Sequence, residues 1–132
     1  MNNKRYVLAS LMVFVFIFVF EWFFHGVLLH DLYTQTQNLW RAKEDVIMPA
    51  MFLGQLTFPF IFTFIFIKGY ENKGIGEGIR YGILIGLLFI PSNLIYYAVM
   101  PLPFVLVGLW ILGGLIEMIL AGAIVSIIYR KA

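Results

Sequence analysis

The chain is 132 residues long, with 62% hydrophobic residues, 12% charged residues and a mean hydropathy of +0.94. A soluble domain of this length buries only about two thirds of its surface and carries about twice this share of charge, so composition excludes an ordinary soluble fold. The net charge of +2 is compatible with nucleic-acid binding, but the basic residues are dispersed and mostly flank apolar runs, which argues against it. The absence of cysteine excludes disulfides, thiol catalysis and iron–sulfur ligation.

Four apolar runs are long enough to cross a bilayer as helices, which takes about 20 residues each. They cover residues 6–24, 47–67, 81–100 and 104–128. The alternating phenylalanines of FVFIFVF do not indicate a strand, because the residues between them are also apolar and an open strand edge cannot lie in lipid. The sequence therefore predicts an all-α fold, a single transmembrane domain over residues 1–132 that forms an antiparallel four-helix bundle.

Glu21 and His25 lie four residues apart near the outer end of the first predicted helix, so their side chains share one face. Three interpretations stay open: a carboxylate that reaches water, a structural Glu21–His25 contact, and a metal or haem site that also uses His30. On a straight helix His30 lies about 140° round from His25, so a break at Gly26 would have to bring them together. We expect Glu21 and His25 to be in contact, without a bound metal.

Residues 25–46 form the predicted outer connection. Leu28, Leu29, Leu32 and Tyr33 recur at near-helical spacing, and polar residues occupy much of the other face. This pattern predicts an amphipathic helix that lies on the outer surface of the membrane.

The third predicted helix carries a stripe of small residues for close helix packing, Gly78, Gly82 and Gly86. Pro91 follows in the same helix, where we expect a kink. The stretch Gly74-Ile-Gly-Glu-Gly comes just before the stripe but lacks the Lys-Ser/Thr of a nucleotide-binding loop. We expect it to form a flexible inner turn.

Glu117 lies almost at the midplane of the fourth predicted helix, with Gly113 and Ala121 one turn away on either side for helix packing. An ionised carboxylate at that depth costs at least about 2.5 kcal/mol, so we expect Glu117 to face protein and to be uncharged unless a cation or base lies beside it. Depth also allows Asn93 and Gln55 to join it in an intramembrane polar site. Two interpretations stay open: a hydrogen bond that holds helices together, and a proton, cation or ligand site.

The distribution of basic residues predicts the topology. With the N-terminus inside, two basic residues lie outside, Arg41 and Lys43, and seven lie inside: Lys4, Arg5, Lys68, Lys73, Arg80, Arg130 and Lys131. We therefore expect both termini in the cytoplasm.

Several stretches resemble a group of small four-helix bacterial membrane proteins of unknown function. They are KGYENKGIGEGIRYGILIGLL, the turn with YYAVMPLP, GGLIEMILAGAIVSIIYR and the outer HGVLLHDLYTQTQNLWR. The resemblance implies the fold and a bacterial inner membrane, and it carries no activity and no catalytic residue.

Two histidines, two membrane carboxylates and no cysteine make a poor constellation for catalysis, so the sequence argues against an enzyme. We predict a small accessory subunit that packs against larger membrane proteins, for instance in a respiratory or other redox complex. One alternative is a proton- or cation-coupled transporter or channel, formed by an oligomer around Glu117. The other is a metal- or haem-binding membrane protein that uses Glu21, His25 and His30. The leading interpretation needs no cofactor, and its partners are membrane lipids and a larger complex or a homo-oligomer.

Overall fold

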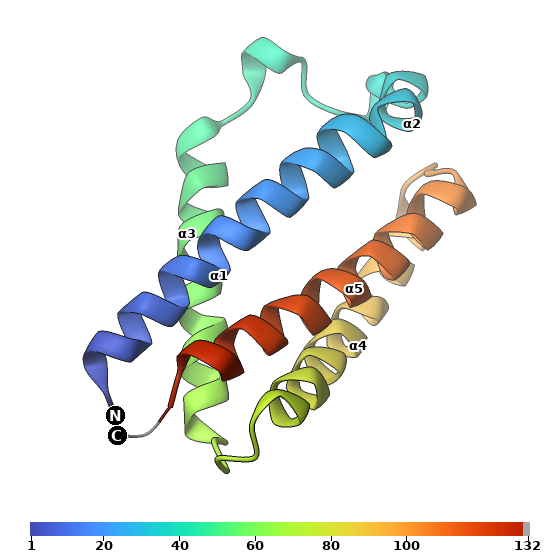
Figure 1. The fold of residues 1–132 in the computed structure, drawn as a ribbon. Helices are drawn as coiled ribbons and strands as arrows, with labels where there is room; N and C mark the ends of the chain where they lie inside the picture. Colours follow the sequence, from blue (N-terminus) through green and yellow to red (C-terminus); the bar gives the residue numbers. More distant parts are fainter. Residues whose placement is uncertain (131–132) are drawn as a thin grey trace.

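The computed structural model describes residues 1–130 (Figure 1). Most of them belong to four long helices: α1 (Asn3–Phe23), α3 (Met48–Lys68), α4 (Ile75–Val99) and α5 (Phe104–Ile128). Between α1 and α3 lie a π-helical turn (Phe24–Leu28), the short helix α2 (His30–Gln35) and two 3-10 turns (Gln37–Leu39 and Lys43–Asp45). Every regular element within residues 1–130 is helical, which confirms the all-α prediction.

The four long helices are long and apolar enough to cross a membrane, as predicted. The first continues through the π-helical turn and has 26 residues, and the others have 21, 25 and 25. The bounds of α5 agree with the predicted range 104–128, and those of α3 lie one residue later than predicted at each end. α4 begins at Ile75 instead of residue 81.

The start of α4 corrects the prediction of a flexible turn. Gly74 has a positive φ of 73°, which glycine tolerates, and its carbonyl accepts a hydrogen bond from the Glu77 N–H at 3.1 Å. The buried Glu77 side chain folds back and accepts hydrogen bonds from the backbone N–H groups of Glu71 (2.7 Å) and Lys73 (2.8 Å). Backbone donors of this kind hold phosphate in a nucleotide-binding loop, but here an acidic side chain of the same chain occupies them.

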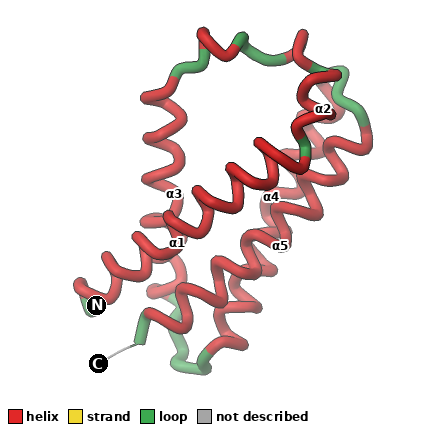
Figure 2. Tube along the Cα trace, turned by 45° about the horizontal axis from the view of Figure 1, so that its top comes forward, coloured by secondary structure: helices red, strands yellow, loops and turns green. Residues whose placement is uncertain are grey.

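The connection between α1 and α3 corrects a second prediction (Figure 2). Instead of one amphipathic helix over residues 25–46, residues 25–28 continue the first span as a π-helical turn, α2 has six residues, and the rest is loop with two 3-10 turns. Thr36 leaves the helical conformation, and its hydroxyl accepts the Trp40 indole N–H at 3.0 Å. The Trp40 ring packs against Trp110 of α5 with 6.0 Å between centroids. These contacts hold the connection against α5, whereas a continuous surface helix needs no such contact.

α4 and α5 pack side by side through the glycine stripe of α4. A Cβ built on Gly78 would lie 2.1 Å from the Gly122 carbonyl oxygen, and one on Gly82 would lie 2.2 Å from the Met118 carbonyl oxygen. A Cβ on Gly86 would lie 2.7 Å from a Leu115 methyl group. The two backbones therefore approach as closely as glycine alone permits.

α1 lies beside α5 and crosses α3, and α1 begins at the end of the molecule where α5 stops (Figure 1). We call this end the terminal end, and the opposite end the α2 end. A core toward the terminal end joins α1, α3 and α5; its buried members are Ala9, Val13, Ile17, Phe62, Phe66, Met118, Ala121, Val125 and Tyr129. Here Tyr6 and Tyr81 donate hydrogen bonds to α3 carbonyls, at 3.2 and 2.6 Å.

Toward the α2 end, α3 diverges from α5 (Figures 1 and 2). The second buried cluster, Leu29, Leu102, Leu106 and Val107, joins α5 to the connections without α3. A common core of α1, α3 and α5 thus closes the terminal end, whereas α3 stands apart from α5 at the α2 end.

Candidate functional site

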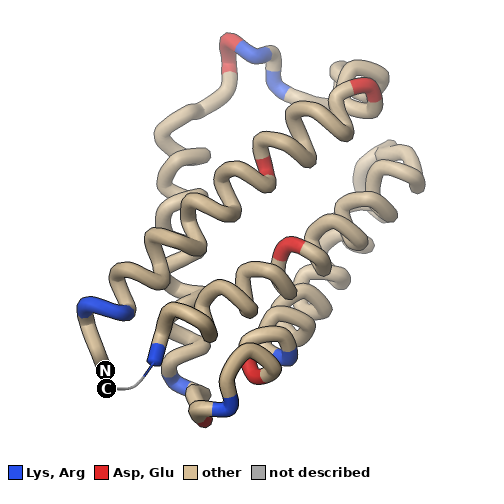
Figure 3. Tube along the Cα trace, in the orientation of Figure 1, with Lys and Arg blue, Asp and Glu red and all other residues tan. Residues whose placement is uncertain are grey.

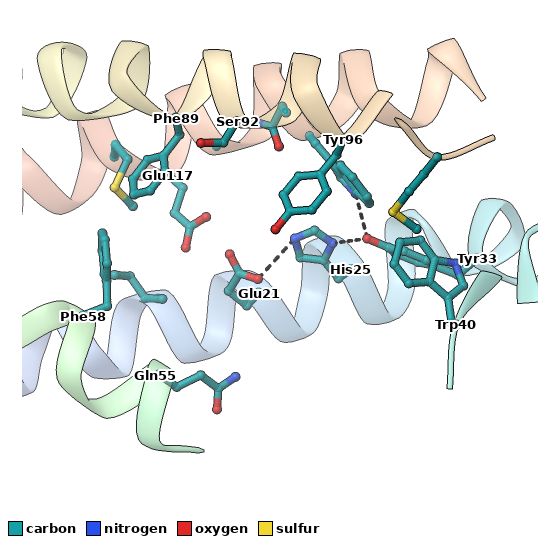
Figure 4. Close-up of a pocket in the computed structure, with 17 residues that line it drawn as sticks. Glu21, His25, Tyr33, Trp40, Gln55, Phe58, Phe89, Ser92, Tyr96 and Glu117 are labelled. Atoms are coloured by element: carbon teal, nitrogen blue, oxygen red, sulfur yellow. Dashed lines mark hydrogen bonds and ion pairs between the residues drawn. The ribbon is translucent and has the colours of Figure 1, made fainter. Parts of the chain in front are cut away.

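Two acidic residues lie inside the apolar spans and away from their ends (Figure 3). Lys and Arg lie at or near helix ends, whereas Glu21 belongs to the apolar span Asn3–Leu28 and Glu117 to the middle of α5. Both side chains point into a cavity of about 790 Å³ between the spread helices (Figure 4). The structure therefore brings together two carboxyl groups that the sequence placed in different helices.

The wall of this cavity is largely apolar and aromatic. Its polar members are Glu21, His25, Tyr33, Gln55, Ser92, Asn93, Tyr96, Trp110 and Glu117, and its other aromatic members are Trp40, Phe58 and Phe89. No lysine or arginine of residues 1–130 lines the wall. Any counter-charge for the two carboxyl groups must come from His25, from a proton or from a ligand.

Glu117 reaches the cavity because small residues surround it on α5. A Cβ on Gly113 would lie 2.2 Å from the Phe24 ring, so the first helical span packs tightly one turn away, and Ala121 is fully buried one turn on the other side. The Glu117 side chain is 5% exposed and points toward Glu21 across the cavity (Figure 4). No N–H group of the described residues donates a hydrogen bond to it, and its hydrogen-bond partner is the Glu21 carboxyl group.

A chain of hydrogen bonds positions Glu21. The Trp110 indole N–H donates to the Tyr33 hydroxyl at 2.8 Å, and that hydroxyl lies 2.6 Å from His25 Nδ1. His25 Nε2 lies 3.2 Å from Glu21 Oε2. The indole can only donate, so the Tyr33 hydroxyl accepts from it and donates its own hydrogen bond to His25 Nδ1. The neutral His25 ring then carries its proton on Nε2, which faces Glu21.

The Tyr33 phenol is suited to this donor role. Burial raises the pKa of Tyr33 to about 12, so the hydroxyl keeps its proton at physiological pH. Tyr33 also packs against the rings of His25 and Trp40, which fixes its position. The short helix α2 thus orients His25 of the π-helical turn through one hydroxyl group.

Gln55 and Asn93 also line the cavity, from α3 and α4. The Gln55 Oε1 atom is buried and has no hydrogen-bond partner within the described chain. α4 runs through Pro91 as one helix, and Ser92 and Asn93 follow on the cavity wall. The two predicted polar residues therefore share the cavity with Glu117.

His30 does not join Glu21 and His25. It belongs to α2 and lines a separate hollow at the surface with Arg41, Lys43 and Glu44. Residues 1–130 contain no group of three histidine or acidic side chains that could hold a metal ion. The three residues of the metal or haem alternative, Glu21, His25 and His30, are therefore not brought together in this arrangement.

Tyr33 is the site residue that sequence reasoning missed. Its spacing with the leucines of the connection assigned it to the apolar face of a surface helix. A tyrosine or tryptophan that becomes buried needs a hydrogen-bond partner, which was the one available signal for Tyr33 and Trp110. The signal identifies the need for a partner without identifying the partner.

Comparison of the chain with protein-family models, with curated proteins and with solved structures gives no match. The function is therefore argued from the cavity and its residues.

Proposed function

We propose that the protein is an integral membrane carrier that binds a cation between Glu21 and Glu117 and exchanges it for a proton. The observation that carries this proposal is the pair of facing carboxyl groups in a cavity of about 790 Å³ whose described wall has no lysine or arginine. Acidic side chains inside a membrane usually serve an ion or proton pathway when they face a cavity.

In this proposal the α2 end is the outer side of a bacterial inner membrane. The terminal end and the loop before α4 are cytoplasmic, in agreement with the excess of lysine and arginine there. The four long helices cross the membrane in alternating directions, as the predicted antiparallel bundle requires. The cavity then opens in the outer half of the bilayer, and the core at the terminal end closes the inner half.

The exchange follows from the charges of the site. Two facing carboxyl groups repel each other when both are ionised, so the empty site holds a proton. A bound cation supplies the positive charge in its place, and the proton leaves to the aqueous side to which the cavity is open. One proton is released for each monovalent cation that binds, so the charge of the site is conserved.

The packing supports a movement that changes access. Glycine contacts lock α4 and α5 into one unit, whereas α3 is joined to its neighbours mainly near the terminal end. A rocking of α1 and α3 against the α4–α5 pair would open the inner half and close the outer half around the same carboxyl groups.

The sequence alone favoured an accessory subunit that packs against larger membrane proteins. The existence of such partner proteins stays a prediction. Such a subunit needs no pair of buried carboxyl groups in a cavity. The cavity is also formed by a single chain, so binding does not depend on the oligomer that the transport alternative assumed.

The test is cation-driven proton movement in liposomes that contain the purified protein and an internal pH dye. Sodium chloride, potassium chloride or the chloride of an organic monocation is added outside, and the cation that is carried should raise the internal pH. We expect the signal to be lost in Glu117→Gln and Glu21→Gln and kept in Glu71→Gln, an exposed glutamate of the inner loop. An undiminished signal in Glu117→Gln would overturn the proposal.

A further inference from the structure

The size and wall of the cavity restrict the cation that it can hold. Its volume of about 790 Å³ falls in the usual range of organic ligand sites, about 300–1,000 Å³. A hard metal ion needs about six or more close oxygen ligands. The oxygens here come from separate helices, and no described group of three histidine or acidic side chains lies close enough to hold a metal.

The rings on the wall suit an apolar or aromatic body with a delocalised charge. Phe58 and Phe89 lie on one side of the two carboxyl groups, and Tyr96 lies on the other (Figure 4). A cation over the face of an aromatic ring gains about 0.5–2 kcal/mol when water is excluded. These rings bind the body of a ligand whose charged group lies between the carboxyl groups.

The unpaired polar atoms call for hydrogen-bond donors on the ligand. Glu117 receives no N–H donor from the described chain, and its carboxyl group pairs only with that of Glu21, which requires a proton on one of the two. Gln55 Oε1 is buried without a partner. The N–H and O–H groups of Trp110, Tyr33 and His25 already donate within the series of hydrogen bonds that ends on Glu21. Once the proton between the two carboxyl groups leaves, Glu117 and Gln55 Oε1 are acceptors without a donor from the chain, which a ligand with N–H groups can satisfy.

From these three features we infer that the ligand is a lipophilic organic monocation with N–H donors, such as an aromatic amidinium or ammonium ion. The N–H groups lie between Glu21 and Glu117, and the apolar body lies against Phe58 and Phe89. This inference rests on the proposed cation-binding function and defines its substrate class.

Three related probes test the inference on the unmodified protein in lipid discs, by calorimetry and by tryptophan fluorescence, to which Trp40 and Trp110 contribute from the cavity wall. Benzamidinium has the charge, the ring and the N–H donors; benzamide has the same shape without the charge; a fully N-methylated benzamidinium keeps the charge without the donors. We expect benzamidinium to bind at least about tenfold more tightly than either relative, since a hydrogen bond to a charged group is worth about a factor of ten or more. Equal affinities for benzamide and benzamidinium, or no binding of benzamidinium, would overturn the inference.

Variants add a second comparison. Glu117→Gln should weaken benzamidinium binding by about tenfold or more and leave benzamide unaffected, whereas Glu71→Gln should change neither. Binding without transport would leave this inference standing and reject the carrier function. Exchange of Na⁺ or K⁺ for protons without benzamidinium binding would reject this inference and leave the carrier function standing.

Discussion

Replacing Gly82 with alanine tests how closely α4 and α5 pack. The added Cβ would lie 2.2 Å from the Met118 carbonyl oxygen and 2.7 Å from the Ile119 Cα, whereas ordinary van der Waals contact begins at 3.4 Å. Both neighbours are backbone atoms, so rotation of a side chain does not relieve the overlap. The two helices have to separate by roughly 1 Å at this level, which disturbs the packing above and below.

We expect Gly82→Ala to lower the free energy of unfolding by about 1–3 kcal/mol, the usual cost of an extra methyl group in a filled core. Gly76→Ala is the matched control, because it makes the same change in the same helix and its Cβ would meet nothing within 4 Å. Alanine is favoured over glycine in a helix by about 0.5–1 kcal/mol, so the control should be neutral or stabilising.

The assay is reversible unfolding in mixed micelles with a rising fraction of dodecyl sulfate, followed by circular dichroism. Both variants are measured beside the unmodified protein under the same conditions. An unchanged stability of Gly82→Ala, or an equal loss in Gly76→Ala, would refute the close approach of α4 and α5.

Three further results are expected. Tyr33→Phe removes the acceptor of the Trp110 indole N–H and should cost about 1–3 kcal/mol in the same unfolding assay; an unchanged stability would contradict the hydrogen-bond chain. Glu77→Ala removes the acceptor of two backbone N–H groups and should speed proteolysis of the loop before α4, whereas an unchanged cleavage rate would argue against this role. The sequence contains no cysteine, so single cysteines at Gln37 and Asn72 report topology directly, and they should react with impermeant reagents from opposite sides of the membrane. Reaction from one side would overturn the proposed orientation.

Much of the fold could be predicted because apolar length is a strong signal. The range 104–128 agrees with α5 because a proline comes directly before it and the apolar run ends at Tyr129. The start of α4 was predicted too late because glycine is typical both of flexible turns and of close helix contacts. The α1–α3 connection could not be predicted because the contact between Trp40 and Trp110, far apart in sequence, decides its course.

The site was predictable only as far as local spacing and depth allow. Glu21 and His25 are four residues apart, so helical geometry brings them together, and they lie 3.2 Å apart in the structure. Depth in α5 indicated that Glu117 faces protein, but not which helix it faces. The helix that Glu117 faces depends on how each helix is rotated about its own axis. That rotation is set by contacts between helices, which cannot be predicted from a single sequence.

Infrared difference spectroscopy on the protein in lipid discs tests the central claim most directly, because it observes the carboxyl groups themselves. Addition of benzamidinium should remove the signal of a protonated carboxyl group and add that of a carboxylate, with one proton released per ligand bound. The change should be absent in Glu117→Gln and retained in Glu71→Gln. Saturable binding of the cation with no change in any carboxyl signal would contradict the exchange of a cation for a proton between Glu21 and Glu117.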